Sequence, residues 1–423
     1  MKQKNIELLS PAGDVEALKA AIDYGADAVY MGGLGYGLRS PAESRVDLDQ
    51  LRECVEYVHS HGKKIYFTFN IYSRDDDVEG MTQAIRNAVD IGADALIVAD
   101  LGNLALIRQV APEMPIHVST QANITNSLSA LTYVGLGAER VVLARECTME
   151  QASKICDSLI EYGKTHDFTP EVETFVHGAM CVSYSGRCLL SNRLTQRDGN
   201  RGECAQPCRW KYHLYEESRP GQYFPVETDD RGTYIMNSND LCMIDHIPEL
   251  IEAGITSLKI EGRMKTAYYV AGVTAAYRAA IDAYLRDPQE YYDRLPEFVE
   301  EVSKTSHRRY YTGFYLDGRV GYEGQNQDSS QYIRGYTFIA SVMEQGDAPG
   351  KLLIMQRNRF KAGEELEVLA PYSKHFTFTV TEITDAKTGE PMEVAPHAMQ
   401  KLYINCPITL PEGAILRRKE DQE

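Results

Sequence analysis

The chain has 423 residues, of which 43% are hydrophobic and 25% charged. This is the composition of a globular protein with a sizeable core. A formal net charge of −17 argues against a protein that coats nucleic acid nonspecifically, because an acidic surface repels phosphates. We see no signal-peptide pattern before Pro11 and no run of roughly 18 apolar residues that could span a membrane. We therefore expect a cytoplasmic protein with reduced cysteines and no membrane contact.

One local pattern recurs along the first 260 residues. A helical stretch ends at a glycine, and a short apolar run follows; the glycines are Gly25, Gly92, Gly137 and Gly254. Glycine at a helix C-terminus takes a left-handed conformation at little cost. A continuous apolar run is typical of a buried parallel strand. The repetition predicts alternating helices and parallel strands.

Adding similar apolar runs gives eight candidate strands. They begin near Ile6, Lys64, Ile116 and Thr174 and after each of the four glycines. Their starts are about 21 to 36 residues apart, with one gap of about 80 residues before the last strand. Eight such units predict an α/β fold, a TIM-type (β/α)8 barrel over residues 1–285, with an open doubly wound sheet as the alternative.

The long gap predicts an insertion, residues 181–255, after the seventh strand. Loops after barrel strands form the catalytic face, so we expect the chemistry there. Residues 286–333 read as a polar connecting segment. From residue 334 to 423 short alternating strands separated by glycines such as Gly350 and Gly363 predict a small all-β, barrel-like C-terminal domain.

Four of the nine cysteines lie between residues 181 and 208: Cys181, Cys188, Cys204 and Cys208. The spacing is C-x6-C, then fifteen residues, then C-x3-C. Four thiolates that converge can hold a cubane iron–sulfur cluster or tetrahedral zinc. The tight C-x2-C knuckles of structural zinc are absent, so the spacing favours a cluster, with zinc and unliganded thiols as the alternatives.

The segment from Glu173 to Ser191 resembles the signature of peptidase family U32. The family pattern, E-x-F-x2-G-[SA]-hydrophobic-C-x4-G-x-C-x-hydrophobic-S, is matched at every specified position. Residues 7–13 and 259–263 resemble other family segments, and residues 357–364 resemble the C-terminal β domain of many members. The resemblance covers the barrel from about residue 5 to residue 285.

The resemblance implies a [4Fe–4S] cluster held by Cys181, Cys188, Cys204 and Cys208. The members most similar in size and domain plan are tRNA hydroxylation proteins, which make 5-hydroxyuridine at the wobble position and use prephenate as a cosubstrate. The resemblance therefore implies tRNA as a partner, and it leaves open a second subunit, either a U32 paralogue or a second copy of the chain. Three alternatives remain: a hydroxylase of another RNA, a collagenase-like peptidase, and a non-catalytic adaptor that binds RNA or a protein. The chain has no H-E-x-x-H or G-x-S-x-G motif for proteolysis.

Polar residues that follow predicted strands are candidates for catalysis, because these strand ends meet at the catalytic face. These candidates are Asn70, Gln121, Glu146, His177, Glu261 and Arg263. We expect Arg263, or Arg187 as second choice, to bind a carboxylate such as that of prephenate. Glu261 is a candidate general base or a partner of that arginine, and His177 is expected to lie behind the cysteine site.

The insertion is locally basic. From Arg187 to Lys211 six cations oppose two anions, a local charge of +4. We hypothesise that Arg193, Arg201 and Arg209 contact RNA or an anionic cosubstrate, and that Ser10 lies in the same binding site. The alternative for the arginines is a solvated loop.

Overall fold

A computed structural model describes residues 5–38, 46–181, 183–209, 228–229, 232–233, 238–316, 332–346, 350–371 and 376–420. Within these ranges no helix is both long enough and apolar enough to cross a membrane.

The N-terminal region is a closed barrel, as predicted. Its eight parallel strands are β1 (Glu7–Ala12), β2 (Ala28–Met31), β3 (Lys64–Phe69), β4 (Ala95–Val98), β5 (Ile116–Val118), β6 (Arg140–Val142), β7 (Glu171–Ala179) and β11 (Ser257–Ile260). The sheet closes because β11 pairs with both β1 and β7. This closure excludes the open doubly wound sheet.

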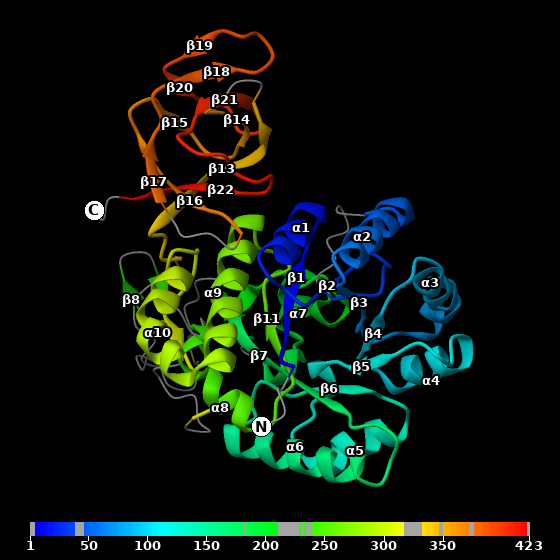
Figure 1. The fold of residues 1–423 in the computed structure, drawn as a ribbon. Helices are drawn as coiled ribbons and strands as arrows, with labels where there is room; N and C mark the ends of the chain where they lie inside the picture. The colour runs from blue at the N-terminus through cyan, green and yellow to red at the C-terminus, as the bar shows by residue number, and fades with distance from the viewer. Residues whose placement is uncertain are drawn as a thin grey trace, which may run out of the picture.

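Helices surround the strands (Figure 1). They are α1 (Val15–Asp23), α2 (Leu48–Ser60), α3 (Val78–Asp90), α4 (Leu101–Val110), α5 (Ser127–Gly135), α6 (Met149–Gly163), α8 (Ile247–Glu252) and α9 (Ala267–Arg286). The glycines of the repeated pattern have left-handed backbones, with φ of 102° at Gly25 and 92° at Gly254. A side chain at either position would be strained, which is why the pattern marks where each helix ends.

The insertion contributes short elements around the cysteines. These are η3 (Tyr184–Gly186), α7 (Leu190–Thr195), η4 (Gly199–Arg201), η5 (Pro207–Arg209), β8 (Thr228–Asp229) and β9 (Gly232–Thr233). The insertion ends before β10, and not at residue 255 as predicted. β10 (Asp240–Cys242) pairs antiparallel with β7, and α8 after it is the barrel's own helix before β11.

The expected connecting segment belongs to the barrel domain instead. It contains α10 (Pro288–Ser303), which packs along α9, and Phe298 and Val302 are buried in the barrel's outer core. After α10, β12 (Tyr310–Tyr311) pairs with β10. The boundary predicted from the sequence was wrong because α10 has more polar residues than buried apolar ones, which hides its buried face.

The C-terminal domain is antiparallel β structure, as predicted. Its strands are β13 (Tyr336–Gln345), β14 (Lys351–Gln356), β15 (Phe360–Lys361), β16 (Glu365–Leu369), β17 (Phe376–Thr379), β18 (Ile383–Asp385), β19 (Pro391–Met392), β20 (Val394–Ala395), β21 (Lys401–Asn405) and β22 (Ile415–Lys419). The main sheet has the order β17-β16-β22-β13-β14-β21-β18-β19 and carries its own apolar core.

The two domains share a buried contact next to α1 and α9 (Figure 1). Tyr24 of α1 donates its hydroxyl hydrogen bond to the Leu369 carbonyl at 2.7 Å. Arg417 of β22 is fully buried and binds both carboxylate oxygens of Glu301 in α10, at 2.6 and 2.8 Å. The C-terminal domain is therefore packed against the barrel.

Candidate functional site

A cavity of about 120 Å³ lies at the carboxyl ends of the barrel strands, beneath the cysteine-rich insertion. Its strand-end lining includes Tyr30, Leu38, Thr68, Asn70, Ile97, Ser119, Thr120, Gln121, Val142, Arg145, Phe175, Lys259, Glu261 and Arg263. The insertion adds Cys181, Ser185, Cys188, Leu190, Ser191, Gly199, Cys204, Pro207 and Cys208. The structure thus brings the four cysteines and the polar strand ends to one place.

All four cysteines carry free thiols around this cavity. Backbone N–H groups point at two sulfurs: Leu190 donates to the Cys188 sulfur at 3.3 Å and Gln206 to the Cys204 sulfur at 3.4 Å. Such hydrogen bonds stabilise thiolates that bind metal.

A zinc ion and an iron–sulfur cubane need different arrangements of these four thiols. Among the described residues, no three His, Cys, Asp or Glu side chains are close enough to hold one metal ion. A closed zinc site needs sulfurs about 3.8 Å apart, because each Zn–S bond is about 2.3 Å. A cubane takes one cysteine sulfur on each of four irons, so its four thiolates need not meet at a single ion.

The first cysteine loop is tied to the barrel by Glu146. Its two carboxylate oxygens accept hydrogen bonds from the Ser185 backbone N–H at 2.6 Å and from the Ser185 hydroxyl at 2.7 Å. Ser185 has a left-handed backbone, with φ of 43°, which is unfavourable for a residue other than glycine. Glu146 therefore holds the loop between Cys181 and Cys188 rather than facing the cavity.

One side of the cavity is cationic. Arg145, Lys259 and Arg263 line it, and each is less than one-tenth exposed. Arg145 lies 3.4 Å from the carboxylate of Glu261, which lines the same side. Arg263 donates to the Thr68 hydroxyl at 3.0 Å and to the Leu38 carbonyl. Among the residues that line the cavity, three cations stand against one carboxylate, which suits an anionic ligand.

The cavity lining also carries two amides, those of Asn70 and Gln121. Asn70 accepts from the Leu38 N–H at 3.0 Å and donates to the Ser119 hydroxyl at 3.4 Å. The Gln121 side chain is 5% exposed, and its amide oxygen has no hydrogen-bond partner within the described residues. A buried amide oxygen without a partner costs about 1–3 kcal/mol, so it is an open position for a ligand donor.

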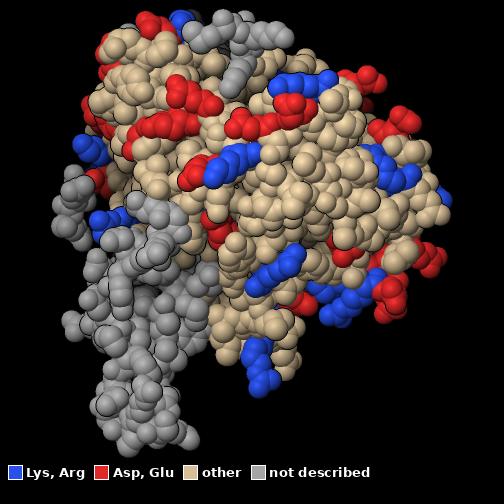
Figure 2. Space-filling view, turned by 90° about the horizontal axis from the view of Figure 1, so that it is seen from below, with Lys and Arg blue, Asp and Glu red and all other residues tan. Residues whose placement is uncertain are grey.

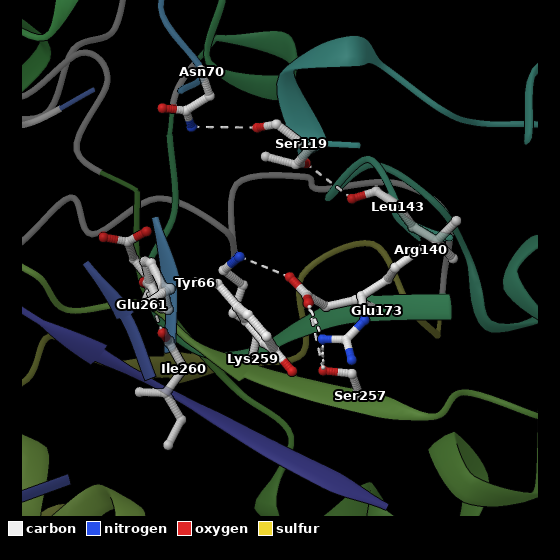
Figure 3. Close-up of polar contacts among 12 residues, drawn as sticks. Tyr66, Asn70, Ser119, Arg140, Leu143, Glu173, Ser257, Lys259, Ile260 and Glu261 are labelled. Atoms are coloured by element: carbon white, nitrogen blue, oxygen red, sulfur yellow. Dashed lines mark hydrogen bonds and ion pairs between the residues drawn. The ribbon is translucent and has the colours of Figure 1, made fainter. Parts of the chain in front are cut away.

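Below the cavity the barrel interior contains a group of charged residues (Figure 3). Arg140 of β6 contacts Glu7 at 2.5 Å, Glu171 at 2.5 Å and Glu173 at 3.0 Å. Lys259 binds Glu173 from the cavity side at 2.7 Å. Glu171 is half-exposed, whereas Arg140, Glu173 and Lys259 are buried and support the floor of the cavity.

Ser10 and His177, like Glu146, lie away from the cavity. Ser10 is fully buried on the outer side of β1, where its hydroxyl lies 2.8 Å from that of Thr274 in α9. His177 is enclosed by tyrosines, with its ring nitrogens 3.3 Å from the Tyr277 hydroxyl and 3.4 Å from the Tyr310 hydroxyl. Alternate residues of a strand face opposite sides, so a position at a strand end is not enough to reach the site.

The arginines of the insertion divide by role. Arg201 binds both carboxylate oxygens of Asp77, at 2.7 and 2.8 Å, and holds the pKa of Asp77 at about 2. Arg187 donates to the Gln121 carbonyl at 3.0 Å and to the Tyr72 hydroxyl at 2.8 Å. These two arginines anchor the insertion to the barrel, and their assignment to substrate binding stays a prediction.

Arg193 and Arg209 are the other two predicted arginines. Arg193 is exposed, and its side chain forms no ion pair or hydrogen bond within the described ranges. The side chain of Arg209 lies outside the described residues. On the face shown in Figure 2, Lys and Arg lie among Asp and Glu instead of forming one patch.

Arg145 and Lys259 line the cavity but were not predicted. Arg145 directly follows the β6 region and precedes Glu146, which was chosen in its place. Lys259 lies inside a strand that reads as apolar, and only its register shows that it faces inward. A charged residue in a buried strand was the available signal for Lys259.

Known proteins resemble the chain over nearly its whole length. A Bacillus subtilis protein named tRNA hydroxylation protein P1 is 38% identical over 397 residues, 94% of this chain and 91% of that protein. An Escherichia coli protein named 23S rRNA 5-hydroxycytidine C2501 synthase is 36% identical over 78% of this chain and 48% of its own length. A Porphyromonas gingivalis protein named Collagenase is 32% identical over 76% of each chain.

Family models match both domains. Residues 13–325 match the model described as peptidase family U32, and residues 334–417 match that of the U32 C-terminal domain. The chain belongs to peptidase family U32.

Proposed function

We propose that this protein is an RNA-modifying enzyme that hydroxylates a wobble uridine of tRNA to 5-hydroxyuridine. It uses a [4Fe–4S] cluster and prephenate as the cosubstrate. The observation that carries the proposal is the single cavity lined by four cysteines, three buried cations and two amide side chains. Relatives named for tRNA and rRNA hydroxylation support RNA as the substrate class.

The cluster ligands in this proposal are Cys181, Cys188, Cys204 and Cys208. A bound cluster would supply redox or Lewis-acid chemistry next to the substrate. The chain's own groups bind and orient. Prephenate carries two carboxylates, which suit the guanidinium groups of Arg145 and Arg263. Glu261 is placed to hold or accept a proton beside them.

The target base must leave its stack to reach this cavity. Gln121 and Asn70 offer amide groups that can pair with the edge of a pyrimidine. The exposed Arg193 can contact phosphate outside the cavity. A net charge of −17 makes such local contacts, rather than the whole surface, responsible for RNA binding.

A peptidase is the second candidate, because one relative carries the name Collagenase. If the four cysteines hold a metal, none of them is free as a nucleophile. A non-catalytic adaptor is a third candidate and needs no cavity chemistry. Both alternatives predict unchanged tRNA nucleosides when the gene is deleted.

The first test measures iron and acid-labile sulfide in protein purified without oxygen. We expect about four of each per chain, lost in serine variants at the four cysteines and retained in Cys406→Ser, whose thiol is buried in the C-terminal domain. Stoichiometric zinc or no metal would refute the cluster.

The second test analyses tRNA nucleosides from a deletion strain complemented with variants. Arg263→Met and Glu261→Gln should abolish 5-hydroxyuridine while the cluster spectrum stays intact. Loss of the cluster in these variants would make both residues structural, and 5-hydroxyuridine at normal levels in the deletion strain would refute the function.

A further inference from the structure

Lys259 is a buried amine at the floor of the cavity. It lies on β11, faces the barrel interior and lines the cavity, with its side chain only 5% exposed. Figure 3 shows its amine directed at Glu173, which is 2.7 Å away. The proposed function gives this lysine no role.

The surroundings of Lys259 weaken its ammonium form. The ring centres of Tyr30 and Phe175 lie 4.3 and 5.5 Å from its amine, and these rings take the place of water around it, although a ring face also attracts the ammonium. The charge of Glu173 is shared with Arg140, at 3.0 Å. Burial lowers the pKa of Lys259 below its usual value even with Glu173 beside it. A desolvated lysine with cationic neighbours is the usual form of an amine nucleophile.

Two guanidinium groups are placed around the same rings. Arg145 lies 4.2 Å from the ring centre of Phe175, and Arg263 lies 5.8 Å from that of Tyr30. Both line the cavity with Lys259. A carboxylate bound by either arginine would bring an adjacent carbonyl carbon toward the lysine.

We propose that Lys259 forms an imine with the carbonyl carbon of a 2-oxo acid bound in this cavity. Lys259 gives one ammonium proton to the carboxylate of Glu173, and its nitrogen lone pair attacks the carbonyl carbon. The C–N bond forms as the carbonyl π bond becomes a hydroxyl. That hydroxyl leaves as water with the returned proton, and a protonated imine remains. One ammonium and one ketone give one iminium and one water, so no oxidant or reductant is needed.

The imine withdraws electrons from the bonds next to the former carbonyl carbon, which prepares them for cleavage or rearrangement. The inference rests on the proposed function only in that prephenate, itself a 2-oxo acid, would be the natural carbonyl compound. Lys259 would then be a catalytic residue in addition to the groups that bind the carboxylates.

The test is reductive trapping on the full-length protein purified without oxygen. The protein is incubated with prephenate, or with pyruvate as a small 2-oxo acid, in the presence of cyanoborohydride. It is then digested and its peptides are mapped by mass spectrometry. Lactate, which has no ketone, is the ligand control. Lys154→Met, which removes an exposed lysine of α6, is the protein control for Lys259→Met.

We expect one reduced adduct, at Lys259, with either oxo acid and none with lactate. Lys154→Met should keep the adduct and Lys259→Met should lose it. Absence of an adduct at Lys259 in the wild-type chain, or labelling confined to exposed lysines, would overturn the inference and leave Lys259 as an ion-pair partner of Glu173. Because this readout uses the wild-type chain, it does not depend on how Lys259→Met folds.

RNA hydroxylation is assayed separately. An adduct without RNA hydroxylation would keep the role of Lys259 and refute the proposed function. Full hydroxylation by Lys259→Met would refute the inference alone.

Discussion

At the scale of single residues, the side of a strand decides a role more than its position along the chain. Glu261 and Arg263 were predicted from their place after β11, and both line the cavity. His177 and Ser10 were predicted by the same argument, yet they face the helices. Sequence places a residue near a strand end, but only the register of the closed barrel shows which way its side chain points.

His177 gives a prediction about pH. Burial, with smaller effects of His307 and Lys265, lowers the pKa of His177 to about 3. The folded state keeps the ring neutral, whereas the unfolded chain binds a proton below about pH 6.5. Stability from this residue is therefore lost as pH falls from about 6.5 toward 3. Between pH 7 and pH 5 the loss is about 2 kcal/mol.

In His177→Gln, which can still bond the tyrosines, this loss should disappear. Denaturant unfolding at the two pH values measures it. His166→Gln, at an exposed position, is the control and should keep the wild-type slope. An unchanged slope in His177→Gln would show that the ring is protonated in the folded protein.

At the scale of elements, the cysteine insertion is held by Glu146, which the sequence analysis assigned to catalysis, and by Arg201, which it assigned to substrate binding. Glu146 holds η3, and Arg201 joins η4 to Asp77 at the start of α3. The insertion is thus fastened to loops after several different barrel strands. Its basic charge was read correctly from the sequence, but its contacts could not be, because they join residues more than 30 positions apart.

Glu146→Gln tests the first of these contacts. The amide can replace only one of the two acceptors of Ser185, so a charge-assisted hydrogen bond worth about 1.5–3 kcal/mol is lost. We expect the proposed cluster to be lost in air about tenfold faster or more. Absorbance decay measures the rate. Glu150→Gln, on the exposed side of α6, should match the wild type; equal rates in the two variants would contradict the role of Glu146.

Variants of Arg193 and Arg201 can be compared to separate RNA binding from anchoring of the insertion. Arg193→Ala should weaken tRNA binding and reduce the slope of log affinity against log salt by about one, with iron content unchanged. Arg201→Ala should lower iron content instead, because Asp77 loses its bidentate partner. Filter binding at several salt concentrations and iron analysis check both. A reduced salt slope in Arg201→Ala with full iron content would restore the RNA-contact interpretation.

At the scale of the whole molecule, the two domains are joined through buried charge as well as apolar contact. Arg417 is fully buried between Glu301 of the barrel domain and Glu367 of its own domain. Without Arg417, Glu301 and Glu367 would share the cation of Lys304, which lies 3.8 and 3.0 Å from them, and losing one partner of a buried ion pair costs up to about 3–5 kcal/mol.

Arg417→Leu should therefore lower protection of β16 and β22 from hydrogen exchange, as measured by mass spectrometry. Its neighbour Arg418 pairs with Glu364 with 27% of its side chain exposed, so Arg418→Leu should cost at most about 1 kcal/mol. Equal loss of protection in both variants would show that burial of Arg417 is unimportant for domain contact.

The sequence alone determined the repeated helix–glycine–strand units, the all-β tail and the four-cysteine group, because each depends on neighbours along the chain. A left-handed turn needs glycine at Gly25 or Gly254 whatever the rest of the chain does. Tertiary structure alone decided the inward charges. Arg140, Glu173 and Lys259 lie on the neighbouring strands β6, β7 and β11, and Glu7 of β1 reaches Arg140 only when the barrel closes. A buried charge is tolerated only where its partner arrives with it.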